Sequence, residues 1–360
     1  MTDIFGMRSV LLAAGVALIA SLVGTPLVIR FFRRRGYGQL IRDDGPQAHM
    51  SKRGTPTMGG TAIILSAILG YVVATLTGWW SARGTVSFFD AWSSGGLLAV
   101  GVFAGMGAVG FLDDYIKIRR NRSLGLTKTA KFTGQALVAG IFAVGAQYVA
   151  ETSTNLSFIG ATSFDFGRFF VLWCFIILAA TSNAVNLTDG LDGLAAGVSA
   201  LVFGAYTIIA FWQFRHEGDY ALAVTLHADA LAIAAAAAMA ACLGFLWWNA
   251  FPAKIIMGDT GSLAIGGLLA ALAVLTETQL LLVIIGGLYV VETASVILQV
   301  GSFRLFGRRL FKMAPLHHHF ELGGWHETTV MVRFWIVGGL AVGFGLGLFY
   351  AEAINRGVAG

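Results

Sequence analysis

Long apolar runs alternate with short polar segments along the whole chain. Runs of this length can cross a hydrocarbon core of about 30 Å as α-helices. Backbone groups in lipid must find partners within their own segment, so helices are the expected form. The pattern predicts ten spans, at residues 9–31, 59–79, 95–112, 132–149, 169–186, 194–213, 231–248, 262–276, 280–300 and 331–351. We expect an all-α polytopic membrane protein whose residues 1–360 form a single integral-membrane domain.

The composition supports this class. Hydrophobic residues make up 57% of the chain and charged residues only 12%, whereas soluble proteins carry about 25% charge. The N-terminal run is followed by Arg30 and Arg33 to Arg35. Charge in that position is wrong for a cleaved signal peptide, so we interpret the run as a retained first span. The two cysteines, Cys174 and Cys242, lie inside apolar runs and have no metal-ligand spacing.

The basic residues predict the orientation. Lys and Arg concentrate in cytoplasmic loops. Of the 24 basic residues, 19 fall in one alternating set of loops and only five on the other side. That set is therefore expected to face the cytoplasm, with both termini extracytoplasmic. The net charge of +5 is explained by this distribution, and we expect no nucleic-acid partner.

Acids, amides and imidazoles gather on the same predicted cytoplasmic side, although they come from segments far apart in the chain. They are Asp113, Asp114, Asn186, Asp189, Asp192, Asn249, Asp259, His317, His318 and His319. This coincidence predicts an active site at the cytoplasmic face.

The first constellation is the Asp-Asp pair at the end of the third run. Adjacent carboxylates near lipid are costly unless a cation holds them. Asp113 and Asp114 have Lys117 one turn further on, with Arg119 and Arg120 behind it. Carboxylates beside basic residues suit a magnesium ion and the phosphates that it bridges. The alternative is a solvated helix end.

The second constellation is the acidic loop 183–193, which contains no basic residue. Asp189 and Asp192 are three positions apart, so a single turn would place them on the same face. Gly190 and Gly193 allow the backbone to approach a ligand closely. A plain turn is the alternative, although a turn needs no paired acids.

The third constellation is Asp259, which stands between Gly258 and Gly261 just before a span begins. Asp, Thr and Ser in this position can simply cap a helix. A helix N-terminus also binds anions, and an acid beside it can hold the metal ion that accompanies the anion.

The triple-His run 317–319 and the segment 52–60 complete the set. Three consecutive imidazoles cannot all face one metal ion, so contacts to a phosphate or a base are more natural than a zinc site. The segment 52–60 is basic and Gly-rich, which is a weak signal alone.

Phosphoryl transfer needs positioning and charge neutralisation more than covalent chemistry from the protein. A soluble nucleotide and a lipid phosphate as substrates would explain a site at a membrane surface.

Five stretches together resemble the polyprenyl-phosphate N-acetylhexosamine-1-phosphate transferases. They are Lys-x-Gly-Thr-Pro-Thr-Met-Gly-Gly at 52–60, Asp-Asp-Tyr at 113–115, Asn-Leu-Thr-Asp-Gly-Leu-Asp-Gly at 186–193, Met-Gly-Asp-Thr-Gly-Ser at 257–262 and Pro-Leu-His-His-His-Phe-Glu at 315–321. The first and last resemble the muramoyl branch of this family.

The resemblance implies a reaction, substrates and a cofactor. UDP-N-acetylmuramoyl-pentapeptide and undecaprenyl phosphate would give lipid I and UMP with Mg²⁺, the first membrane step of peptidoglycan synthesis. It also implies the bacterial inner membrane with its lipid as surroundings, ten spans and a homodimer.

The resemblance further implies roles for individual residues. Asp259, Asp113 and Asp114 would be the metal and catalytic acids, and His317 would act with them. The substrate-binding residues would be Lys52, Thr57, Lys117, Lys131, Asn186, Asp189, Gly190, Leu191, Asp192, Asn249, Gln299, His318 and His319. One departure is Ile256, where the family commonly has a Phe that can lie on uracil.

Other interpretations remain open at this point. A sister enzyme that transfers N-acetylglucosamine-1-phosphate is one, and a transporter is another. Carriers place polar residues near the bilayer midplane, whereas the acids here lie at span ends. The mechanism is also open, because an aspartate could attack the nucleotide, or the lipid phosphate could attack directly.

Overall fold

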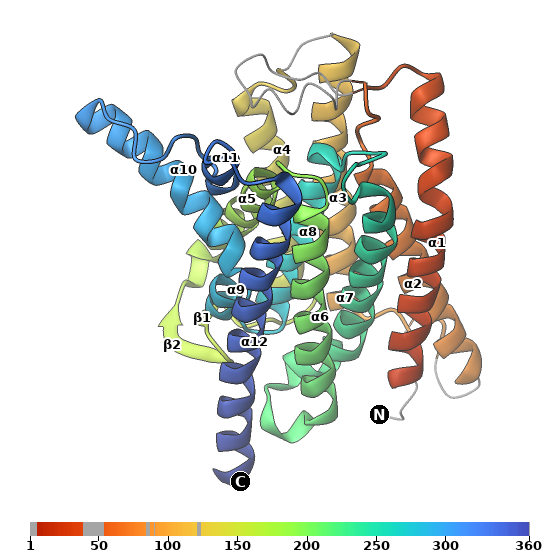
Figure 1. Cartoon of the computed structure of the whole chain (residues 1–360). Helices are drawn as coiled ribbons and strands as arrows, with labels where there is room; N and C mark the ends of the chain where they lie inside the picture. The colour runs from red at the N-terminus through yellow and green to blue at the C-terminus, as the bar shows by residue number, and fades with distance from the viewer. Residues whose placement is uncertain (1–5, 39–53, 84–86, 90, 121–123, 360) are drawn as a thin grey trace.

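The computed structural model of the protein describes residues 6–38, 54–83, 87–89, 91–120 and 124–359, and it is dominated by helices (Figure 1). The helices are α1 (Met7–Arg34), α2 (Gly60–Ser81), α3 (Ser94–Arg119), α4 (Lys128–Tyr148), α5 (Phe170–Thr188), α6 (Leu194–Arg215), α7 (Leu222–Asn249), α8 (Gly258–Leu275), α9 (Gln279–Ile285), α10 (Gly287–Phe306), α11 (Leu316–Glu321) and α12 (Glu327–Ala359). A two-stranded hairpin, β1 (Asn155–Ser157) and β2 (Ala161–Asp165), lies between α4 and α5.

Nine helices of the described ranges are long and apolar enough to cross a membrane. They are α1, α2, α3, α5, α6, α7, α8, α10 and α12. The fourth predicted run is helix α4, but its 21 residues are not among the nine. The chain is therefore a multi-pass membrane protein.

The expectation of an all-helical chain is wrong at one place. Strands β1 and β2 pair antiparallel, with Asn155 opposite Asp165 and Ser157 opposite Ala161. Gly160, at φ +91°, makes the turn between them, a conformation that glycine adopts without strain. The strands are three and five residues long, too short to stand out beside the long apolar runs.

Several span limits also differ from the prediction. Helix α7 begins at Leu222 rather than near 231, because the polar residues of its first turns have partners and do not end the helix. His227 of these turns bonds Ser93 Oγ at 2.8 Å. Helix α3 continues past 112 to Arg119 and so includes the Asp pair. The ninth run is divided into α9 and α10 at Gly286.

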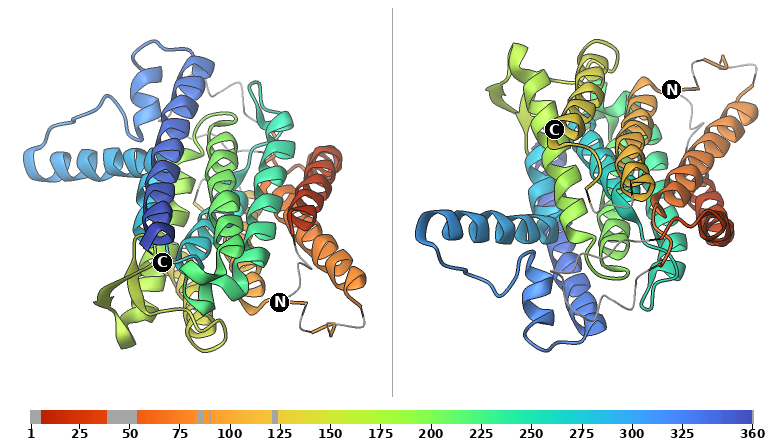
Figure 2. Two further views of the ribbon diagram at one scale, coloured as in Figure 1. Left: turned by 90° about the horizontal axis from the view of Figure 1, so that it is seen from below. Right: turned by 90° about the horizontal axis from the view of Figure 1, so that it is seen from above.

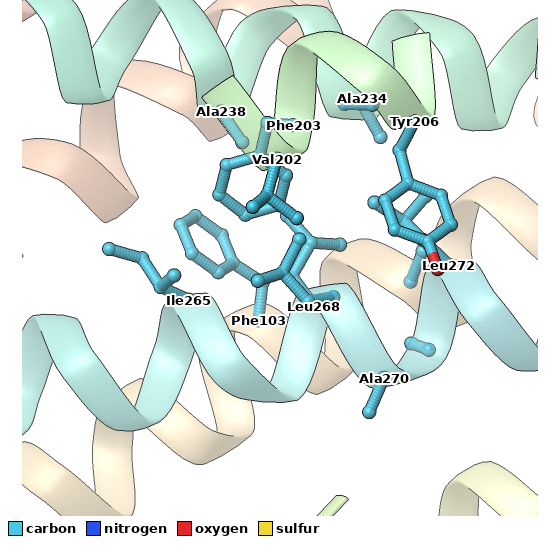
Figure 3. Close-up of a cluster of buried hydrophobic side chains, with 14 of the residues drawn as sticks. Phe103, Val202, Phe203, Tyr206, Ala234, Ala238, Ile265, Leu268, Ala270 and Leu272 are labelled. Carbon is cyan, nitrogen blue, oxygen red and sulfur yellow. The ribbon is translucent and has the colours of Figure 1, made fainter. Parts of the chain in front are cut away.

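The centre of the bundle is built from small and aromatic residues of α3, α6, α7 and α8. In Figure 3, Phe103 of α3 lies among Phe203 of α6, Ala238 of α7 and Leu268 of α8. All four side chains are at most 1% exposed. Small side chains allow helix backbones to approach closely in a membrane, where packing rather than water exclusion drives association.

The two ends of the bundle are distinct. Helix α1 begins and α12 ends at the lower end in Figure 1, whereas α11 lies at the opposite end. The second half of α10 leans away from the other helices, as both views of Figure 2 show. Its exposed side chains include Leu298, Phe303 and Phe306.

Candidate active site

Three carboxylates meet where α3 ends and α8 begins. Asp113 and Asp114 lie in the last two turns of α3, and Asp259 lies in the first turn of α8. One oxygen from each lies within 4.8 Å of the others. Asp113 and Asp114 are only 3% and 4% exposed. The alternative of a solvated helix end is therefore wrong.

Two lysines close this acidic cluster. Lys117 Nζ lies 2.6 Å from Asp113 Oδ2, 3.1 Å from Asp259 Oδ2 and 3.4 Å from Asp114 Oδ1. Lys131, from the first turn of α4, places its Nζ 2.8 Å from the same oxygen of Asp259. Three carboxylates face two ammonium groups, so the cluster retains negative charge that a cation can neutralise.

Each carboxylate is anchored through its other oxygen. Asp114 Oδ2 accepts hydrogen bonds from the backbone N–H and the hydroxyl of Thr260, at 2.9 and 2.8 Å. Asp113 Oδ1 accepts from the N–H of Leu126 at 2.9 Å. Asp259 Oδ1 accepts from Asn186 Nδ2 at 2.7 Å. One oxygen of each acid is thus fixed by the protein, and the other is presented to the lysines.

Glycines let the helices approach closely enough for these contacts. A Cβ added to Gly110 of α3 would lie 2.1 Å from the carbonyl oxygen of Asp259. A Cβ on Gly60 of α2 would lie 2.0 Å from the backbone nitrogen of Gly261. Real Cβ atoms do not approach backbone this closely, so α2 and α3 hold the first turn of α8 by direct backbone contact.

Capping does not explain Asp259. Met257 is the N-cap of α8, and no side chain makes a capping hydrogen bond there. Ser262 Oγ instead donates to the carbonyl of Gly258 at 3.0 Å. The Asp259 carboxylate is directed to Lys117, Lys131 and Asn186.

The loop after α5 brings further polar groups to the cluster. Asn186 Nδ2 also contacts Ser262 Oγ, at 2.8 Å. Burial raises the pKa of Asp189 well above its ordinary value, and the negative charges of Asp259 and Asp114 raise it further. The N–H of Gly258 opposes this shift. A cation in the cluster would favour the ionised form of Asp189.

Asp192 has different partners from Asp189. Its Oδ2 accepts from the N–H of Ala253 at 2.8 Å, and its own N–H donates to Glu327 Oε1 at 2.9 Å. Asn249 Oδ1 accepts from the N–H of Gly193 at 3.1 Å. These contacts join the start of α6 to the segment that follows α7. Leu191, 3% exposed, is packed inside.

The three imidazoles diverge, as their adjacency predicts. His317 Nδ1 lies 3.2 Å from Glu292 Oε1. His318 Nδ1 lies 2.7 Å from Glu321 Oε2, and His319 Nδ1 accepts from the N–H of Lys312 at 3.1 Å. They therefore have separate surroundings.

Gln299 and Thr57 occupy supporting positions, and Lys52 lies outside the described residues. The amide of Gln299 bonds the backbone of Leu310 and Phe311 in the segment after α10. The backbone of Gly59 and Gly60 donates to Ile256 and Met257 at 2.9 Å. Thr57 is thereby brought beside Gly258, and its Oγ1 lies 3.0 Å from where a Cβ on Gly258 would stand.

Sequence reasoning missed the contributions of Thr260, Ser262 and Glu292. Thr260 and Ser262 were attributed only to capping, yet they bond Asp114 and Asn186. Glu292 gave a detectable signal, because it is an isolated acid inside an apolar run and such residues are rare in spans.

The donor set fits a hard divalent cation. Asp113, Asp114 and Asp259 offer carboxylate oxygen alone, and oxygen ligands are those that magnesium prefers. The described residues of the cluster include no thiolate or imidazole, the ligands that softer metals favour. Asp113, Asp114 and Asp259 are the residues that would hold such an ion.

Comparison with known proteins gives consistent matches. Residues 96–277 match Glycosyl transferase family 4, and residues 52–64 match signature 1 of the phospho-N-acetylmuramoyl-pentapeptide-transferases. A protein of that name from Frankia alni is 58% identical, over 98% of this chain and 99% of its own length. Those of Streptomyces coelicolor and Cutibacterium acnes are 53% and 50% identical, each over 96% of this chain and 98% and 99% of their own lengths.

Proposed function

The chain belongs to the phospho-N-acetylmuramoyl-pentapeptide transferases, and on that premise we propose how its site performs the transfer. The donor is UDP-N-acetylmuramoyl-pentapeptide and the acceptor is undecaprenyl phosphate. The products are lipid I and UMP, which makes this the first membrane step of peptidoglycan synthesis. The observation that supports this site most strongly is the position of Lys117 among three carboxylates, two of them buried and that of Asp259 half-buried.

The acceptor phosphate attacks the donor directly in this proposal. An oxygen of undecaprenyl phosphate forms a bond to the sugar-linked phosphorus of the diphosphate. The bridging P–O bond breaks, and UMP leaves with its electrons. Lys117 and Lys131 neutralise charge on the phosphates, which is the main demand of phosphoryl transfer. Because the metal and the lysines meet that demand, an aspartyl-phosphate intermediate is not needed.

Asp113, Asp114 and Asp259 hold magnesium in this proposal. The ion supplies charge neutralisation at the diphosphate when it is bound. Asn186 and Ser262 keep Asp259 oriented toward it, and Thr260 does the same for Asp114. Supporting hydrogen bonds of this kind preserve the direction of a ligand.

The acceptor's hydrocarbon chain requires an apolar route that leads to the site. A groove between α5 and the α9–α10 pair provides one. Its lining is almost entirely apolar and includes Trp173, Ile177, Ala180, Ala184, Val290 and Ile297. Ala184 lies two positions before Asn186, so the groove runs along α5 toward the end of the helix that carries Asn186. An apolar groove open to lipid suits a polyprenyl chain.

The site faces the cytoplasm in this proposal, because the donor is a soluble cytoplasmic nucleotide and 19 of the 24 basic residues lie in the loops on that side. Helix α4 then supplies a tenth crossing, with α9 and α10 together forming another. An even number of crossings agrees with α1 beginning and α12 ending at the same end of the bundle. The location is the bacterial cytoplasmic membrane.

The test is reconstituted transfer by the purified protein. With UDP-N-acetylmuramoyl-pentapeptide, undecaprenyl phosphate and magnesium, UMP and lipid I should appear in equal amounts. UDP-N-acetylglucosamine as the donor tests the sister activity in the same assay. Lipid-linked product from that donor, with none from the muramoyl donor, would disprove the proposed specificity.

A further inference from the structure

Glu292 is the sole acidic residue of α10, and its side chain is fully buried. A carboxylate in a membrane-spanning helix is costly, so such residues usually have a functional partner. Glu292 lies six positions into the helix, next to Thr293, which lines the apolar groove. The acid therefore stands between the groove and the interior of the protein.

The partner of Glu292 is His317. Its Nδ1 lies 3.2 Å from Glu292 Oε1, and the imidazole is also fully buried. Within the described residues, neither oxygen of Glu292 and neither nitrogen of His317 forms a well-aligned hydrogen bond. Asp113 and Asp114, by contrast, are each anchored by good hydrogen bonds. A pair that served stability alone would be expected to satisfy its polar atoms.

The other face of the imidazole meets the loop of the candidate active site. A Cβ added to Gly190 would lie 2.1 Å from His317 Nε2 and 2.8 Å from Cε1. The ring thus lies between the Glu292 carboxylate and the Asp189–Gly190 turn. Asn186, at the base of this turn, holds Asp259.

We infer that Glu292 is a positioning residue that acts through His317, an inference that rests on the proposed transfer function. When the carboxylate accepts a hydrogen bond from Nδ1–H, the neutral ring keeps its lone pair on Nε2 and presents it to the Gly190 turn. The partner of one ring nitrogen decides which tautomer the other nitrogen shows. Glu292 also fixes the ring plane, and so the place of the turn.

The test is the isosteric substitution Glu292→Gln, measured in the transfer assay. We expect kcat to fall about 10- to 100-fold, the loss typical of partners that orient a functional imidazole. Both KM values should stay near those of the unmodified protein. A loss of stability with an unchanged kcat would show a structural role alone and would overturn the inference.

Other charged groups near the ring are unchanged in this variant. The imidazole of His318 lies 4.2 Å away between ring centroids and is paired with Glu321. Asp189 and Asp192 belong to the adjoining turn. Since they remain in both proteins, a fall in kcat is attributable to Glu292.

A second test uses the double variant with His317→Gln. If Glu292 acts only through His317, adding Glu292→Gln to His317→Gln should cause no further loss of kcat. Groups that act as one unit are non-additive in this way. Full additivity would overturn the inference.

The control is Ser295→Ala on the same helix. Ser295 Oγ donates to the carbonyl of Glu292 at 2.6 Å, so this variant loosens the same turn and leaves the carboxylate in place. Its kcat should stay near that of the unmodified protein. If Glu292→Gln does not fold, Glu292→Asp replaces it, with a lower kcat expected. An unchanged kcat in Glu292→Asp would count against the role.

The two proposals fail in different ways. An unmodified protein without transferase activity would refute the proposed function. An active unmodified protein whose Glu292→Gln variant keeps the same kcat would refute the role of Glu292 alone.

Discussion

Lys131 of α4 and Asp259 of α8 form an ion pair of 2.8 Å between side chains that are 128 positions apart. The pair joins the first turns of two helices to the cluster at the end of α3. Asp259 therefore links three helices by ion pairs, because Lys117 of α3 contacts the same oxygen at 3.1 Å.

Asp259→Asn should reduce transfer by at least about 100-fold, since the variant loses a metal ligand and the partner of two lysines. The protein should still fold and insert, because the amide keeps the shape of the side chain. The rate of UMP release measures the effect. Asp219→Asn, in the exposed segment between α6 and α7, is the matched control and should be fully active. Substantial magnesium-dependent turnover by Asp259→Asn would contradict the metal assignment.

Removal of divalent cations should abolish transfer, and magnesium should restore it. Three carboxylates with only two lysines leave a site that needs a further positive charge. Asp113→Asn and Asp114→Asn should each need more magnesium for half-maximal rate. Titration of the rate with magnesium tests both statements. Undiminished activity in excess chelator would show that the cluster works without a metal ion.

Gly190→Ala should lower kcat/KM at least about tenfold, because the added methyl group meets the His317 ring at 2.1 Å and the turn must move. Gly140→Ala is the matched control, since nothing lies within 4 Å of its Cβ position in α4. That substitution should stabilise the helix by about 1 kcal/mol. Thermal unfolding and kinetics of both variants test the pair. Equal activity of the two would remove the argument for close contact at Gly190.

Ala180→Trp should raise the KM for undecaprenyl phosphate and leave the KM for the donor unchanged. Ala180 lines the apolar groove, and a large side chain there would compete with the polyprenyl chain for space. Leu172→Trp, an exposed position of α5 outside the groove lining, is the control. A rise in the KM for the donor instead would place the groove in a different role.

Incubation of the enzyme with donor labelled in the sugar phosphate, without lipid, should leave the protein unlabelled. Direct attack by the acceptor phosphate needs the lipid before any bond to UMP breaks. Acid-stable label on the protein, together with one UMP released per enzyme, would instead establish an aspartyl intermediate.

Much of this architecture was predictable, because lipid imposes a simple rule on sequence. Runs of apolar residues must be helical, so α2, α5 and α6 were found close to their observed limits. The division at Gly286 was not predicted, since α9 and α10 are both apolar. The hairpin was missed for a related reason, because its short strands lack the length that made the spans visible.

The site was predictable as a set of residues but not as a set of contacts. Asp113, Asp114 and Asp259 stood out because charge is rare in this chain. In each acid one oxygen is held by a hydrogen bond, from Thr260, Leu126 or Asn186, and the other faces the lysines. These partners belong to common residue types, so the sequence does not mark them. Only the folded chain shows which of them approach the acids.

The backbone contacts at Gly60 and Gly110 have a consequence for antibiotic resistance. A compound that bound the three carboxylates would meet groups whose positions are set by glycines with no room for a methyl group. Single substitutions at these positions would displace Asp259 and disable the enzyme along with the drug. Escape would then have to arise at the rim of the site, where side chains such as Ile256 are only half-buried and can change without moving α8.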